Sequence, residues 1–247
     1  MSLWRSPIDD GIHPPGSWAT VTHNGISYQM RVPPEDYIGG VLCSGVPYEV
    51  ELLEKMSVFI TPDAVILDVG ANIGNHAVFW ALIKGAKVIA VEPNPEALLY
   101  LRNNVSLNHL ADSIDIRATA AGAHKGTAEV SERTTGNLGR TILSYGSGPL
   151  PVTTVDSIVG STRVSLIKID VEGAEATVLA GAVGVLTRDW PPVICEAADD
   201  HYIAAIDAVL VPLGYVRAEE NLAWTPTYLW SIPATPLLRL EADTPVL

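Results

Sequence analysis

Acidic residues stand at the ends of four apolar runs of this sequence, where they could bind a ligand and move a proton. The four acids are Asp68, Glu92, Asp170 and Glu196. A carboxylate can accept hydrogen bonds from ligand hydroxyls or take a proton from a reacting group. In an open α/β sheet, ligands bind outside the carboxyl ends of the strands. If the apolar runs are parallel strands, the four acids lie at one ligand site.

Residues 68–76, DVGANIGNH, indicate which kind of nucleotide-like cofactor the chain binds. A dinucleotide pyrophosphate needs glycines spaced G-x-G-x-x-G, whereas here only Gly70 and Gly74 are present. The carboxylate of Asp68 would repel a pyrophosphate, but it suits the sulfonium and amino groups of S-adenosylmethionine. The two glycines let the backbone come close to a ligand at the start of the following helix. The pattern therefore favours S-adenosylmethionine over NAD.

Several residues near this turn are candidate contacts for the cofactor. Glu92 can accept two hydrogen bonds from a ribose diol, which serves S-adenosylmethionine and NAD alike. Asn94 either reaches the adenosine or caps a helix, and Asn72 and Asn75 either cap the first helix or contact the methionine carboxylate. The adenine is expected near Ala121. The predicted cofactor-binding residues are Asp68, Gly70, Asn72, Gly74, Asn75, His76, Glu92, Asn94, Ala121 and Asp170.

A second, overlapping group of residues could carry out a methyl transfer. A hydroxyl acceptor is a poor nucleophile until a base removes its proton, and a carboxylate or a histidine can do so. The predicted catalytic residues are Asp170, Glu172, Glu196 and His201. Because clustered carboxylates repel one another, either one of them is protonated or a cation such as Mg²⁺ lies among them. We expect a metal-independent reaction with Asp170 as base or acceptor anchor and assign no metal ligand, with Mg²⁺ as the alternative.

Alternating strands and helices must position these side chains. Short apolar runs predict buried parallel strands, and apolar-faced segments between them predict helices. The sequence predicts an α/β fold: a doubly wound, mostly parallel, seven-stranded sheet of the Rossmann-like kind with an antiparallel last strand. Strands are expected within residues 65–69, 87–95, 114–121, 164–169, 192–196, 215–217 and 228–232, and helices over 76–84, 95–109, 174–186 and 203–213. The first and fourth strands are neighbours in such a sheet, which places Asp170 near the transferable methyl group.

The beginning of the chain is predicted to cover the site. Asn24-Gly25 lies between two alternating runs and predicts a β-hairpin over residues 19–32. Apolar residues at helical spacing predict an amphipathic helix over residues 48–60. Residues 126–155 are rich in turn-forming residues and are expected to be a loop on the wall of the substrate pocket, with a short edge strand within residues 149–155. The predicted domains are residues 1–60, a hairpin and helix extension that covers substrate and cofactor, and residues 61–247, the cofactor-binding domain.

Composition and charge limit the partners. The net charge of −13 argues against nucleic acids and anionic membranes, because both would repel the surface. The sequence has neither eighteen consecutive apolar residues nor a basic-then-apolar start, so a cytoplasmic enzyme is expected. Two cysteines and six scattered histidines give no disulfide framework and no zinc spacing. The expected partner is a small-molecule acceptor, and self-association into a homo-oligomer stays open.

Three motifs together resemble the FkbM family of S-adenosylmethionine-dependent methyltransferases. They are residues 68–76 (DVGANIGNH), 92–95 (EPNP) and 168–175 (KIDVEGAE), in the right order and spacing. The resemblance runs from about residue 48 to residue 196. It implies a class I methyltransferase for a hydroxyl of a sugar, polyketide or similar natural product, with N-methylation of a peptide or amine as the alternative. It also makes Tyr48 and Glu49 candidate contacts of substrate or cofactor, while a packed tyrosine and a solvated glutamate remain the simpler interpretation.

Two other classes of function stay open at this point. An NAD-linked oxidoreductase fits the fold, but the missing glycines and the lack of a Tyr-x-x-x-Lys pair weigh against it. A subunit that binds S-adenosylmethionine without chemistry of its own is the third hypothesis, and the presence of Asp170 and Glu172 weighs against it.

Overall fold

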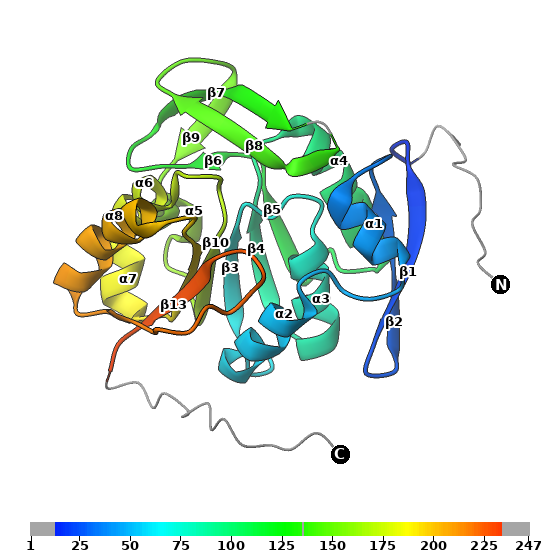
Figure 1. Ribbon diagram of the computed structural model, residues 1–247, viewed down its shortest axis with the longest axis horizontal. Helices are drawn as coiled ribbons and strands as arrows, with labels where there is room; N and C mark the ends of the chain where they lie inside the picture. Colours follow the sequence, from blue (N-terminus) through cyan, green and yellow to red (C-terminus); the bar gives the residue numbers. More distant parts are fainter. Residues whose placement is uncertain (1–12, 135, 234–247) are drawn as a thin grey trace.

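A seven-stranded sheet forms the centre of the protein, as Figure 1 shows for a computed structural model that describes residues 13–134 and 136–233. The strand order is β12-β13-β11-β10-β3-β4-β5. The strands are β3 (Val65–Val69), β4 (Lys87–Val91), β5 (Ile114–Arg117), β10 (Leu166–Ile169), β11 (Val193–Glu196), β12 (Val216–Arg217) and β13 (Thr227–Ser231). From β11 to β5 the neighbours are parallel, whereas β13 is antiparallel to both β11 and β12. The predicted fold class is confirmed.

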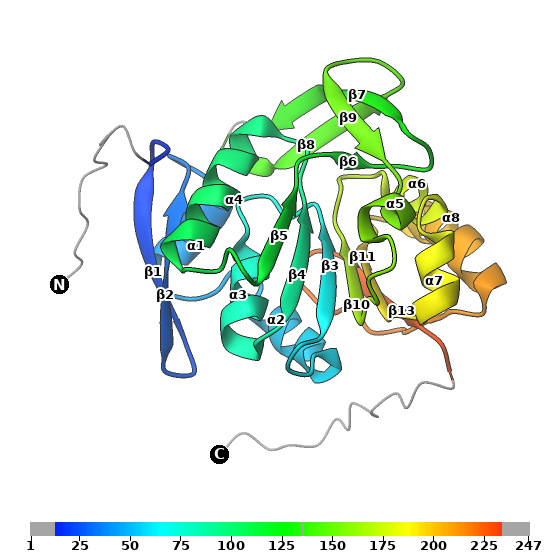
Figure 2. The ribbon, with the colours of Figure 1, turned by 180° about the vertical axis from the view of Figure 1, so that it is seen from behind.

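Helices cover both faces of the sheet, because successive residues of a strand point to opposite sides. Ile66 belongs to one apolar core with α3 and α4, and Leu67 belongs to the other with α5 to α8. In Figures 1 and 2, α5 to α8 lie together on the side of β10, β11 and β13. The elements are α3 (Asn75–Lys84), α4 (Pro95–Leu107), α5 (Val155–Val159), α6 (Glu175–Ala180), α7 (Val183–Asp189), α8 (Asp200–Leu210) and the 3₁₀ turn η2 (Val211–Leu213).

One predicted helix, over residues 174–186, is two helices in the structure. Gly181 lies between α6 and α7, and a Cβ added to it would come within 2.1 Å of the carbonyl oxygen of Gly122. Two backbones can approach this closely only at a glycine, and the helix is interrupted there.

The structure contains the short strand predicted within residues 149–155, but the rest of the predicted loop over residues 126–155 is mostly strand as well. The segment contains β7 (Gly126–Thr134), β8 (Asn137–Tyr145) and β9 (Leu150–Thr153), which join β6 (Ala120–Ala121) in a separate sheet of order β6-β9-β7-β8. Ala128, Leu150 and Val152 form part of its small apolar core. The predicted third strand is therefore also divided, since β5 belongs to the main sheet and β6 to the small one.

A hairpin and two short helices precede the main sheet. They are β1 (Ser17–His23), β2 (Ile26–Val32), α1 (Tyr37–Cys43) and α2 (Val50–Met56), followed by the 3₁₀ turn η1 (Ser57–Phe59). Asn24 and Gly25 have φ values of 48° and 80°, as a two-residue hairpin turn requires. Val21 and Leu53 belong to the same apolar core as Ile66, and this segment packs on the helices that cover the sheet, β2 against α4 and α2 against α3.

Parts of both predicted domains, residues 1–12 and 234–247, lie outside the described residues. Within residues 13–134 and 136–233, no helix has the length and apolar character that crossing a bilayer requires.

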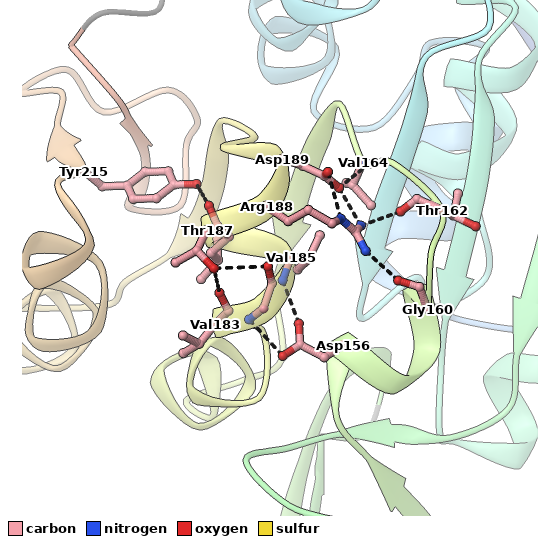
Figure 3. A network of polar contacts seen from close by, with 12 residues as sticks. Asp156, Gly160, Thr162, Val164, Val183, Val185, Thr187, Arg188, Asp189 and Tyr215 are labelled. Atoms are coloured by element: carbon pink, nitrogen blue, oxygen red, sulfur yellow. Dashed lines mark hydrogen bonds and ion pairs between the residues drawn. The ribbon is translucent and has the colours of Figure 1, made fainter.

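A network of polar contacts fixes the segment that leads into β10 (Figure 3). The guanidinium of Arg188 donates hydrogen bonds to the carbonyl oxygens of Gly160 and Thr162, both at 2.6 Å. The neighbouring carboxylate of Asp189 accepts one from the N–H of Val164 at 2.9 Å. These bonds hold the entry to β10, and so they help to place the residues at its far end.

Candidate active site

The carboxyl ends of β3, β4, β10 and β11 open into a cavity of about 1030 Å³. Strand-end residues on its wall are Gly70, Glu92, Asp170 and Glu196. Other parts of the wall come from the segment before β3, from β8 and from the loop before β13. This volume is comparable with that of sites for nucleotide-sized cofactors. Three of the four predicted strand-end acids are thus brought to one cavity.

Asp68, the fourth acid, lies beneath the cavity and is not part of its wall. Its side chain is fully buried, and Oδ1 lies 3.5 Å from Nζ of Lys168. The parallel register of β3 and β10 pairs the two residues directly. The prediction that Asp68 faces the charged groups of a cofactor is therefore wrong, because its cationic partner belongs to the protein.

Lys168 connects this buried acid to the cavity. Its ammonium lies 3.3 Å from Oδ2 of Asp170 and 3.3 Å from the carbonyl oxygen of Gly70, to which it donates a hydrogen bond. Burial alone would lower the pKa of Lys168, but the carboxylates of Asp170 and Asp68 hold it above its usual value. The sequence analysis gave Lys168 no role, although its position two residues before Asp170 places both on one face of the strand.

The glycine turn after β3 places its own backbone and the first residues of α3 at the cavity. Gly70 has a φ of +82°, and a Cβ there would lie 1.8 Å from the carbonyl oxygen of Asp170. Asn75 and His76, the first residues of α3, line the cavity. Gly74 does not, because it packs against Leu101 of α4.

Glu92 is held at the end of β4 by backbone hydrogen bonds. Its carboxylate accepts from the N–H groups of Asn72 and Asn94, each at 2.8 Å. Burial raises its pKa to about 7, although the two N–H donors oppose the shift. Asn72 and Ala121 line the cavity, as predicted for cofactor contacts, whereas Asn94 does not: its side chain caps α4 by accepting from the N–H of Glu96. For Asn94 the capping interpretation is therefore the one that the structure supports.

Asp170, Glu172 and Glu196 form an acidic cluster, with one oxygen of each within 4.8 Å of the others. Burial alone would raise the pKa of Asp170, but the Lys168 ammonium and a hydrogen bond from Glu196 hold it below its usual value. Burial and the charge of Asp170 raise the pKa of Glu196 to about 9 and that of Glu172 to about 7. At neutral pH this cluster therefore contains an ionised acid, Asp170, hydrogen-bonded to a protonated one, Glu196.

His201, the fourth predicted catalytic residue, is not brought to this cluster. It is exposed in the first turn of α8, outside the cavity wall, with its ring against Tyr202. Asp199 caps this helix by accepting from the N–H groups of His201 and Tyr202. In this turn Tyr202 lines the cavity wall, and His201 does not.

Tyr48 and Glu49 both line the cavity, from a segment whose role the sequence left open. Oε2 of Glu49 lies 3.2 Å from Nε2 of His76, and the Tyr48 ring is nearly parallel to that imidazole with a centroid distance of 6.3 Å. No spacing rule predicts this contact, because strand β3 and the glycine turn lie between Glu49 and His76 in the sequence.

Comparisons with known proteins identify the family that this chain matches. Residues 68–217 match the family described as the methyltransferase FkbM domain. The 31-O-demethyl-FK506 methyltransferase FkbM of Streptomyces tacrolimicus is 31% identical, over 73% of this chain and 84% of that protein. The ribosomal protein L11 methyltransferase of Carboxydothermus hydrogenoformans is 34% identical, but only over 26% of this chain and 21% of the relative.

Solved structures share the fold. A methyltransferase FkbM from Methylobacillus flagellatus superposes with a TM-score of 0.50 at 20% identity, over 68% of this chain and 43% of that one. At this identity the likeness concerns the arrangement of strands and helices alone.

Proposed function

Because the chain belongs to the FkbM family of methyltransferases, we propose that it transfers a methyl group from S-adenosylmethionine to a hydroxyl of a small molecule. The observation that carries the proposal is the contact between Lys168 and Asp170 in the cavity wall. It keeps one carboxylate ionised where a hydroxyl could give up its proton. The relative from Streptomyces tacrolimicus, whose name describes transfer to an oxygen, supports the same choice of acceptor.

The cavity offers groups that fit S-adenosylmethionine. The carboxylate of Glu92 has lone pairs for a ribose diol beside the two N–H groups that it already accepts. Oδ1 of Asn72 and Nε2 of His76 are buried without hydrogen-bond partners among the described residues, as expected of atoms that await a polar ligand. The cofactor, when bound, supplies a methyl group on a positively charged sulfur.

The residues of the acidic cluster would perform the proton transfer. Asp170 accepts the proton of the acceptor hydroxyl as the oxygen attacks, and it is available to do so at neutral pH because Lys168 keeps it ionised. Glu196, which retains its own proton, donates a hydrogen bond to Asp170 and holds it in place. The acids on the wall also disfavour a phosphate-bearing acceptor, so we infer that the substrate is a small molecule and not a nucleic acid.

A divalent cation is the alternative source of positive charge, since Asp170, Glu172 and Glu196 could ligate one. Lys168 already places a cation beside Asp170. We therefore propose a reaction that needs no metal, and EDTA should leave it unchanged.

The test begins with isothermal titration of the purified protein with S-adenosylmethionine and S-adenosylhomocysteine. Binding of both is expected, and a folded protein that binds neither would overturn the proposal. Transfer of a labelled methyl group is then followed by mass spectrometry on three acceptors: 31-O-demethyl-FK506, methyl glucoside and methyl glucosaminide. Label on oxygen supports the proposal, and label only on the amine would replace it with N-methylation. Activity that EDTA abolishes and Mg²⁺ restores would overturn the metal-independent mechanism.

A further inference from the structure

The carboxylate of Glu49 is buried in the cavity wall without a strong partner. Its side chain is only 12% exposed. Oε2 lies 3.2 Å from Nε2 of His76 without the alignment of a hydrogen bond, and Oε1 accepts a long bond of 3.4 Å from the Thr225 hydroxyl. The Thr225 hydroxyl supplies no compensating charge, although burying a carboxylate is costly unless a cation is near. The ammonium of Lys168 acts on Glu49 electrostatically, but among the described residues no lysine or arginine forms an ion pair with this carboxylate, so it is available for a cationic group of a ligand.

The surroundings hold this carboxylate in one place. Glu49 has a φ of +54°, in the left-handed region that residues other than glycine rarely adopt. Its own carbonyl oxygen accepts from the N–H of Leu53 and starts α2. The imidazole of His76 is packed between the rings of Tyr48 and Trp80, at centroid distances of 6.3 and 5.6 Å. Strained backbone of this kind is typical of sites where a side chain is presented to a ligand.

The expected orientation of the cofactor in the cavity indicates which of its groups Glu49 binds. A cofactor with its ribose at Glu92 and its adenine toward Ala121 would have Gly70 and the start of α3, which line the same cavity, left for its amino-acid end. This helix has no side-chain cap, so its first-turn N–H groups suit the carboxylate of that end. The ammonium group on the same carbon then needs an anion, and Glu49 lies beside His76 in that turn. Asp170 is the competing anion, but Lys168 already neutralises it.

We propose that Glu49 binds the ammonium group at the amino-acid end of S-adenosylmethionine, and that His76 positions its carboxylate. The inference rests on the proposed function and extends it: the sequence left Glu49 as a candidate contact of either substrate or cofactor, and its burial beside His76 points to one group of the cofactor. The segment before the main sheet would then complete the cofactor site, in addition to covering it.

The experiment compares two ligands on two proteins by isothermal titration. S-Adenosylhomocysteine carries the ammonium group, and its desamino analogue, 5′-S-(3-carboxypropyl)-5′-thioadenosine, differs only in lacking it. The wild type should bind the first about 10- to 100-fold more tightly, as expected for a charge-assisted hydrogen bond. Glu49→Gln should lose most of this preference while it binds the desamino analogue as the wild type does. Glu54→Gln, which changes an exposed acid of α2 that does not line the cavity, is the matched control and should keep the preference.

The outcomes separate this inference from the proposed function. A wild type that binds neither ligand overturns both. A wild type that binds both ligands equally, or a Glu49→Gln variant that weakens both equally, overturns only the role of Glu49. If thermal melting shows that Glu49→Gln is unfolded, Glu49→Asp takes its place: it keeps the charge but withdraws it by one methylene. The preference for S-adenosylhomocysteine should then fall by a smaller factor, and an unchanged preference would count against the contact.

Discussion

The ammonium nitrogen of Lys168 lies between two carboxylates, 3.3 Å from Oδ2 of Asp170 and 3.5 Å from Oδ1 of Asp68. One of these acids is on the cavity wall, with its side chain 36% exposed, and the other is fully buried under it. A single cation therefore serves two purposes. It keeps the acid in the cavity ionised, and it compensates a charge in the core of the sheet.

Replacing Lys168 by methionine should destabilise the protein strongly. Asp68 would be left buried without a cation, which costs about 3–5 kcal/mol when one partner of a buried pair is removed. Urea unfolding of Lys168→Met should reveal the loss. The double variant Lys168→Met/Asp68→Asn is the control, because it removes both charges and should recover most of the stability. An equally unstable double variant would mean that packing of the lysine stem, and not charge, is what matters.

The protonated state of Glu196 should be visible in the pH dependence of stability. Burial and the charge of Asp170 raise the pKa of Glu196 to about 9, from an ordinary value of 4.5. Between these values the folded protein keeps a proton that the unfolded chain releases. The stability from this group is therefore complete below pH 4.5 and is lost as the pH rises toward 9.

Glu196→Gln does not titrate, so its free energy of unfolding should rise relative to the wild type between pH 5 and pH 8. Denaturant unfolding of both proteins at pH 5, 6.5 and 8 measures the difference. The raised pKa values of Glu92 and Glu172 are present in both proteins and act in the same direction in each. A difference that stays constant with pH would show that Glu196 is ionised in the folded state.

Sequence patterns located the strand-end acids well, because a buried parallel strand reads as a continuous apolar run and its end is where a ligand binds. They could not reveal that Lys168 faces Asp68, since that contact depends on the register between β3 and β10. A sequence pattern predicts which residues form a strand, but not how that strand is aligned with its neighbour in the sheet. For the same reason the sequence predicts Asp68 as a cofactor contact, whereas the structure places it beneath the cavity wall, beside Lys168.

The other differences between prediction and structure concern residues whose positions depend on tertiary packing. His201 follows a strand-end acid closely in sequence, but in the first turn of α8 it is exposed while Tyr202 lines the cavity. Strands β7 and β8 are not predicted because they are largely polar and the apolar core of their sheet is small. Glu49 meets His76 only after the segment before β3 packs on the helices that cover the sheet, which no local spacing predicts.

Binding of S-adenosylhomocysteine should strengthen with pH through the titration of Glu92. Burial raises the pKa of this acid to about 7, and ribose hydroxyls donate hydrogen bonds to its ionised form. Affinity should therefore increase by about tenfold from pH 6 to pH 8 and then level off. 5′-Methylthioadenosine has the ribose without the amino-acid end and should show the same rise. Glu92→Gln should bind weakly with no such rise, and a variant that keeps the pH dependence would assign it to another group.

The glycine turn offers a matched pair of substitutions. Gly70 and Gly85 both have positive φ, +82° and +67°, so alanine at either position costs about 1–2 kcal/mol of backbone strain. At Gly85 nothing lies within 4 Å of the added Cβ, whereas at Gly70 the Cβ would be 1.8 Å from the carbonyl oxygen of Asp170. Gly70→Ala must therefore push the end of β10 away from β3.

Gly85→Ala should lose only the strain energy and bind S-adenosylhomocysteine as the wild type does. Gly70→Ala should lose more stability and most of its binding, because the displaced segment carries Asp170 on the cavity wall. Thermal melting and isothermal titration of the two variants measure both effects. If Gly70→Ala bound the ligand as tightly as Gly85→Ala does, the spacing between the ends of β3 and β10 would not be what shapes the cofactor site.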